Sequence, residues 1–205
     1  MTLPSPRTLL MAAAAFVAAG LLAVGGWFWH SSGQHRAMSA YAAALTQAQS
    51  AQGPQAAPDA REAAIRRLES ALTQYSSGSG AAEVAYQLGN LRFEGQQYSQ
   101  ARGAWELAVA QGATRTLKAL SLGGVAYTWE AERNYPKAVE AFKTALTGIG
   151  PKDFYYEELL LGLGRTQELA GQKAEAIATY RRALSELTQS RRAEEIRARL
   201  AALGV

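Results

Sequence analysis

The chain has 205 residues, of which 21 are basic, 17 are acidic and two are histidine, and it contains no cysteine. This length accommodates one domain with an appendage, but not a large α/β enzyme with a separate cofactor domain. The lack of cysteine excludes disulfides, thiol nucleophiles, iron–sulfur clusters and Cys-ligated zinc. With 48% hydrophobic and 19% charged residues, the composition is that of a folded protein rather than a disordered one.

The N-terminal part of the chain has the pattern of a membrane anchor. Residues 8–29 carry no charge, and as a helix they would reach about 33 Å, enough to span a bilayer core. The run follows Arg7 and ends in the aromatic cluster Trp27–Trp29, as at a membrane interface. We therefore predict a short tail at 1–7, a transmembrane helix at 8–29 and a polar juxtamembrane linker at 30–36.

A cleaved signal peptide is the alternative interpretation of this segment. Arg7 would then be its basic region, and the small residues of 15–19 would offer a cleavage site. Against this, Leu21, Leu22 and Val24 continue the apolar run where a signal peptide turns polar. In a bacterium, the positive charge before the run favours an inner (cytoplasmic) membrane protein with a single span and a periplasmic C-terminal domain.

The net charge of +4 does not indicate a nucleic-acid surface. The densest basic cluster lies within 191–199, where arginines alternate with Glu194 and Glu195 at the spacings of ion pairs along a helix. The rest of the sequence has no basic stripe with interleaved aromatic residues. We therefore predict no binding of nucleic acid.

A periodic pattern fills the remainder of the chain. A small residue, a large apolar residue four positions later and an alanine three positions after that recur four times, at intervals of 37, 37 and 38 residues. These offsets place all three residues on one helical face, where the alanines let a neighbouring helix approach. One such helix cannot bury this face alone, so stacked copies are expected to share a continuous core. The four triplets are Ala64–Leu68–Ala71, Ala101–Trp105–Ala108, Ala138–Phe142–Ala145 and Ala176–Tyr180–Ala183.

A partner helix is expected before each triplet helix. Leu88–Gly89 and Leu163–Gly164 precede the triplets of their copies by the same distance, and Val125–Ala126 takes this place in the third copy. Glycine inside a helix costs about 1 kcal/mol relative to alanine, so we expect it at a close contact between the two helices of a pair. The first partner helix is predicted at 37–51, and a helix at 190–203 is expected to cap the stack.

The second copy, LGNLRFEGQQYSQARGAWELA, resembles a tetratricopeptide repeat (TPR). The residues at the motif's characteristic offsets are Leu88, Gly89, Tyr98, Ala101, Trp105 and Ala108. The resemblance extends over residues 37–188 and implies an all-α, TPR-like α-solenoid of about four helix pairs plus the capping helix, in a repeat domain at 37–205. It also implies that the aromatic residues Tyr98 and Tyr135 belong to the core. Because the usual TPR period is about 34 residues, we expect an extra helical turn or longer loops.

The layout is also similar to that of the bacterial TPR ancillary subunit of the SecYEG translocon. In that family an N-terminal anchor ends in a Gly/Trp-rich segment, and an Ala-rich helix and periplasmic repeats follow; GGWFW at 25–29 and AMSAYAAAL at 37–45 keep this order. The resemblance implies a membrane-tethered scaffold or chaperone-like module for polypeptides, with Sec translocon subunits and periplasmic chaperones as partners. The alternative is a structural envelope-assembly protein that links outer-membrane or peptidoglycan machinery.

Candidate catalytic and metal-binding groups do not form a recognisable site in the sequence. Glu157 and Glu158 are adjacent and so point about 100° apart on a helix, which favours a solvated first turn stabilised by the helix dipole. His30 and His35 lack further metal ligands nearby. We therefore predict a protein that is not an enzyme and has no cofactor and no metal.

Four residues of the first helices of the pairs are predicted to face a concave groove that binds a protein partner: Tyr86, Asn90, Tyr127 and Arg165. Asn90 and Arg165 directly follow Gly89 and Gly164, a position from which repeats of this type often contact ligands. Tyr86 stands where a carboxylate clamp would need lysine, so capture of a peptide C-terminus is not expected. The open alternative is that all four are ordinary surface or packing residues.

Overall fold

The computed structural model describes residues 33–53, 55–76 and 78–205. These residues form helices joined by turns and contain no strand, which confirms the all-α prediction. A helix at 33–50 comes first. The others are α2 (Pro58–Gln74), α3 (Ala81–Glu94), α4 (Tyr98–Ala110), α5 (Arg115–Ala131), α6 (Tyr135–Leu146), α7 (Tyr156–Leu169), α8 (Lys173–Glu186) and α9 (Ala193–Ala202).

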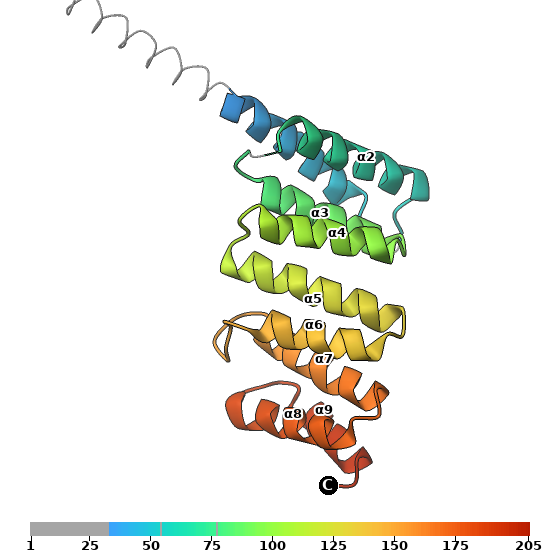
Figure 1. The fold of residues 1–205 in the computed structure, drawn as a ribbon, viewed down its shortest axis with the longest axis vertical. Coiled ribbons are helices and arrows are strands. Elements are labelled where there is room, and N and C mark those ends of the chain that lie inside the picture. Colours follow the sequence, from blue (N-terminus) through green and yellow to red (C-terminus); the bar gives the residue numbers. More distant parts are fainter. Residues whose placement is uncertain (1–32, 54, 77) are drawn as a thin grey trace, which may run out of the picture.

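The helices are stacked one after another along the long axis of the molecule (Figure 1). From α2 to α9 each helix packs against the next, and α3 also packs against α5. The order agrees with four successive pairs and a terminal helix, in which the helices at 33–50, α3, α5 and α7 are the first members of their pairs. The described residues therefore form an all-helical, solenoid-like stack.

The periodic triplets form the centre of this stack. All twelve triplet residues are buried, with exposed fractions of 5% or less. Tyr98 and Tyr135, however, are only half-buried, so their assignment to the core is wrong. Each is the first residue of its helix, where one side lacks a neighbouring turn. The Tyr98 ring packs against Phe93 with the ring centroids 5.6 Å apart and the ring planes tilted by 54°.

Glycines of the first helices make room for the aromatic residue of their own pair. A Cβ atom on Gly89 would lie 2.5 Å from the Trp105 indole, and one on Gly164 would lie 2.7 Å from the Tyr180 ring. Since real Cβ atoms do not approach other heavy atoms so closely, a side chain at either position would displace the ring. The prediction that these glycines lie at close contacts within a pair is confirmed.

Two further glycines make room for the aromatic residue of the preceding pair. A Cβ atom on Gly124 of α5 would lie 2.8 Å from Trp105, and one on Gly162 of α7 would lie 2.7 Å from Phe142. Trp105 is thus held between glycines of two successive first helices, α3 and α5. These contacts join neighbouring pairs, and the sequence pattern did not predict them.

Replacing Gly89 with alanine is expected to destabilise the protein by about 1–2 kcal/mol, because overpacking outweighs the better helix propensity of alanine. Gly103 is the matched control: it is also helical, but nothing lies within 4 Å of the position its Cβ would take. Gly103→Ala should therefore stabilise the protein by up to about 1 kcal/mol. Thermal unfolding of both variants measures the difference, and equal stability would refute the close contact at Gly89.

The repeat is longer than the usual TPR period for both of the expected reasons. Helix α5 has 17 residues where α3 has 14. The connection 147–155 between α6 and α7 is also longer than the connection 111–114 between α4 and α5. The longer connection brings extra side chains to the start of α7.

The membrane anchor predicted at 8–29 and the tail at 1–7 lie outside the described residues. None of the helices within 33–53, 55–76 and 78–205 is both long enough and apolar enough to cross a membrane. The helix at 33–50 includes residues 33–36, which the sequence pattern assigns to the linker at 30–36.

Candidate protein-binding face

Three of the four predicted groove residues occupy one repeated position. Asn90, Tyr127 and Arg165 take the same place in α3, α5 and α7, and all three are half-buried. The guanidinium carbon of Arg165 lies 5.8 Å from the centroid of the Tyr127 ring. The structure therefore brings Tyr127 and Arg165 together on one face, which we call the first-helix face because α3, α5 and α7 form it.

The other two predicted groove residues have packing roles. The side-chain oxygen of Asn90 accepts a hydrogen bond of 3.2 Å from the indole N–H of Trp105, and its amide donates one of 3.2 Å to Gln87. Asn90 thus satisfies the polar atom of a buried aromatic residue. Tyr86 is half-buried against the core that α2, α3, α4 and the helix at 33–50 form. At these two positions the alternative of ordinary packing residues fits the contacts better.

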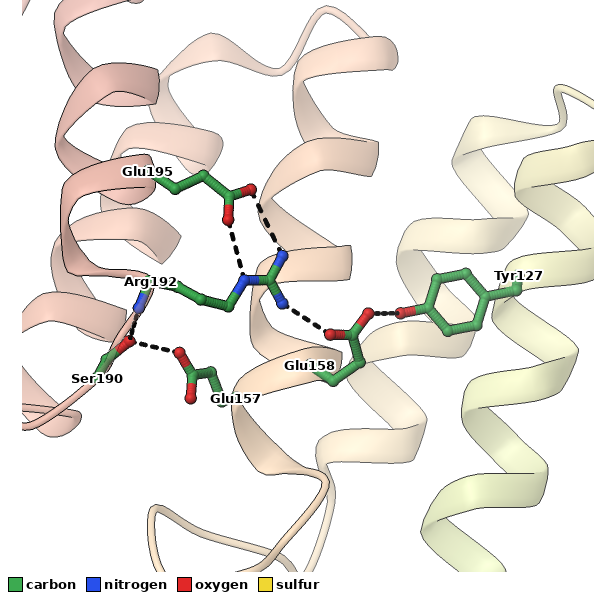
Figure 2. A network of polar contacts seen from close by, with 6 residues as sticks. All are labelled: Tyr127, Glu157, Glu158, Ser190, Arg192 and Glu195. Carbon is green, nitrogen blue, oxygen red and sulfur yellow. Dashed lines mark hydrogen bonds and ion pairs between the residues drawn. The ribbon is translucent and has the colours of Figure 1, made fainter.

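A chain of polar contacts links three elements across the first-helix face (Figure 2). The Tyr127 hydroxyl of α5 donates to Glu158 Oε1 at 2.8 Å, and Arg192 Nη1 donates to Glu158 Oε2 at 2.7 Å. Arg192, which directly precedes α9, also donates through Nε to Glu195 at 3.0 Å. Both oxygens of the Glu158 carboxylate are therefore engaged, and it couples α5 to the start of α9.

The prediction of a solvated Glu157–Glu158 pair is only partly correct. Both glutamates do lie in the first turn of α7, but both are half-buried. Glu157 accepts a hydrogen bond of 2.5 Å from the Ser190 hydroxyl, while Glu158 is held as described above. Because α5 and the turn before α9 supply these partners, the first turn of α7 is a contact with neighbouring elements rather than a free helix end.

A second polar contact joins α5 to α7 on the same face. Glu130 accepts a hydrogen bond of 2.9 Å from Arg165 Nη2 through one oxygen and one from the Thr166 hydroxyl through the other. Thr166 is fully buried, and the Glu130 side chain is 18% exposed. Glu130 therefore holds the Arg165 guanidinium in place beside Tyr127. Because its charge is already paired, Arg165 is not a free cation.

The tyrosines of this face are held in their neutral form. Burial, followed by the nearby Tyr155 and the Glu158 carboxylate, raises the pKa of Tyr127 well above its usual value of 10.0. Burial, and then Glu158, raise the pKa of Tyr155 to about 12. Both phenols therefore act as uncharged groups at physiological pH, and Tyr127 serves as a hydrogen-bond donor.

Replacing Tyr127 with phenylalanine is expected to make stability less sensitive to alkaline pH. Because the folded-state pKa is raised above 10.0, the contribution of Tyr127 is fully present below about pH 10 and is lost as the pH rises above it. Between about pH 9 and pH 11 the free energy of unfolding should fall by about 1 kcal/mol less in Tyr127→Phe than in the unchanged protein. Urea unfolding at both pH values measures this, and an equal fall would contradict it.

A cavity of about 450 Å³ lies beside this network and is lined by Phe154, Tyr155, Glu157, Glu158 and Arg192. Phe154 belongs to the long connection 147–155, and it is 89% exposed. None of these residues was among the four predicted for the groove from the sequence. The run FYYEE at 154–158 was an available signal, because it places aromatic residues directly before an acidic helix start.

The arrangement offers a partner several kinds of contact. Its aromatic rings, carboxylates and one arginine offer apolar contact, hydrogen bonds and ion pairing to a partner. Within the part of the chain that the structure describes, no group of three or more histidine, aspartate and glutamate residues is placed to hold a metal ion.

Comparison of the chain with models of known protein families gives no match, and comparison with curated proteins gives none either.

Proposed function

We propose that the chain is a TPR-type scaffold that binds polypeptide partners on its first-helix face. The repeated triplets, their buried position and the order of helix pairs support the TPR assignment. The exposed Phe154 beside a cavity of about 450 Å³ carries the proposal of binding. Interfaces are enriched in aromatic and arginine side chains at such positions, and stacked repeats use extended surfaces of this kind to bind partners.

The proposal includes tethering to a membrane through residues 8–29, with the repeat domain in the periplasm. A tether confines the domain to the membrane plane, which raises its effective concentration near a membrane partner. The similarity of layout to the ancillary subunit of the SecYEG translocon supports translocon subunits and periplasmic folding factors as partners. Recruitment, not catalysis, is then the activity of the protein.

Photocrosslinking from two positions tests this function in bacterial cells that produce the full chain. A photoreactive residue replaces Phe154, which lies beside the first-helix face in the connection that leads into α7. A matched control replaces Gly103, which is exposed on α4, the second helix of its pair. Protein adducts from position 154 that contain translocon subunits, with none from position 103, are expected. Adducts with envelope-assembly lipoproteins would favour the structural alternative, and no adducts from position 154 would overturn binding at this face.

A further inference from the structure

We infer that the cavity beside Phe154 takes an arginine or lysine side chain of the bound polypeptide. The inference rests on the proposed function and adds which kind of side chain of the bound polypeptide the site prefers. The cavity is largely open to solvent, and its volume of about 450 Å³ lies within the range of about 300–1,000 Å³ typical of small-ligand pockets. One long side chain and part of the adjoining backbone therefore fit.

The charges around the cavity favour a cation. Arg192, the cation among the lining residues, is already compensated, because it pairs with Glu158 at 2.7 Å and with Glu195 at 3.0 Å. Glu157 accepts a hydrogen bond from the neutral Ser190 hydroxyl and forms no salt bridge with any described residue. The cavity thus holds one carboxylate whose charge is unbalanced, and a basic side chain would balance it.

The aromatic wall favours the same ligand. Phe154 and Tyr155 line the cavity together with Glu157 and Glu158. The face of an aromatic ring attracts a cation, and the carbon chain of lysine or arginine packs well against it. The protein already uses this contact internally, since the ring of Trp129 has the Arg102 guanidinium at 3.7 Å and the Lys137 ammonium at 4.4 Å.

An acidic or phosphorylated ligand fits this cavity less well. It would meet Glu157 and Glu158 directly, while the one arginine of the lining is already shared between two glutamates. Like charges brought together in a partly buried site repel each other and lower affinity. The specificity expected is therefore for a basic side chain over a neutral or acidic one.

Fluorescence anisotropy with the full chain in detergent micelles tests this specificity. The probes are labelled ten-residue peptides that are identical except for a central arginine, lysine, glutamine or glutamate. The arginine and lysine peptides should bind about tenfold more tightly than the glutamine peptide. Equal binding of all four peptides, or tighter binding of the glutamate peptide, would overturn the inference.

Two variants and a control connect the specificity to this cavity. Glu157→Gln should remove most of the preference for basic peptides, and Phe154→Ala should weaken the arginine peptide about fivefold. Phe154 is too exposed for its loss to affect folding, which circular dichroism checks. Glu140→Gln is the control, because Glu140 is 73% exposed on α6 and pairs locally with Lys143. An unchanged preference in Glu157→Gln would assign the specificity elsewhere and overturn the inference.

The outcomes separate this inference from the proposed function. Adducts from position 154 that map to polypeptide segments without basic residues would refute the cationic ligand and leave polypeptide binding intact. The absence of both adducts and peptide binding would refute the proposed function, and the inference with it.

Discussion

Replacing Trp105 with alanine is expected to destabilise the protein by about 3–5 kcal/mol. Trp105 is 4% exposed and fills the space between Gly89 of α3 and Gly124 of α5. Removing the indole leaves a cavity between two glycines, which have no side chains to fill it. It also leaves the side-chain oxygen of Asn90 without its donor, which adds to the cost.

Urea unfolding of Trp105→Ala measures this loss, and Trp129→Ala is the matched control. Trp129 is only half-buried, and its ring contacts Arg102 and Lys137, so its loss should cost about 1–2 kcal/mol.

In a stack of repeats, the destabilisation by Trp105→Ala should also be local. Hydrogen exchange should rise first in α3 to α5 while α7 to α9 stay protected, and a loss of protection spread evenly over all helices would argue against the contacts described.

Replacing Glu130 with alanine is expected to cost about 1–3 kcal/mol, because a buried hydroxyl loses its acceptor and a positioned cation loses its partner. Glu130 accepts hydrogen bonds from Thr166, which is fully buried, and from Arg165, whose side chain is 38% exposed. The partial exposure of Arg165 keeps the electrostatic part of this cost small. Chemical denaturation of the variant measures the change in unfolding free energy.

A double-mutant cycle with Thr166→Val shows whether the cost belongs to the contact between α5 and α7. The two substitutions share one hydrogen bond, so their combined cost should fall short of the sum by about 1 kcal/mol. Glu140→Ala is the control: its carboxylate is exposed beside Lys143, and its loss should change stability by less than about 0.5 kcal/mol. Additive costs for Glu130 and Thr166 would mean that the hydrogen bond does not contribute.

The helices and the core were predictable because they depend on a local rule. Residues at offsets of zero, four and seven share a helical face in any helix, and their recurrence marks which faces stack. Gly89 and Gly164 belong to the same rule, since each contacts the aromatic residue of its own pair. Gly124 and Gly162 do not, because their partners belong to the preceding pair, and that contact depends on how pairs approach one another.

The candidate site was only partly predictable. Tyr127 and Arg165 could be selected because they repeat at the position after the packing site of each first helix. Asn90 occupies the same position but bonds to Trp105, and nothing in the pattern distinguishes it. Glu158 was predicted to be solvated because the sequence shows its own helix and not the distant residues that supply its partners, Tyr127 of α5 and Arg192 in the turn before α9.

The amino-acid pattern was sufficient for the helix pairs, their order and their buried faces, because periodicity within a helix and repetition along the chain are properties of sequence alone. The first-helix face needed the folded stack. The partners of Glu158 are Tyr127 and Arg192, 31 and 34 residues away, and the packing of successive repeats brings them together. That same packing brings Arg192 beside Phe154 and Glu157 to complete one cavity, since the contacts between pairs depend on the angle and distance at which their helices meet.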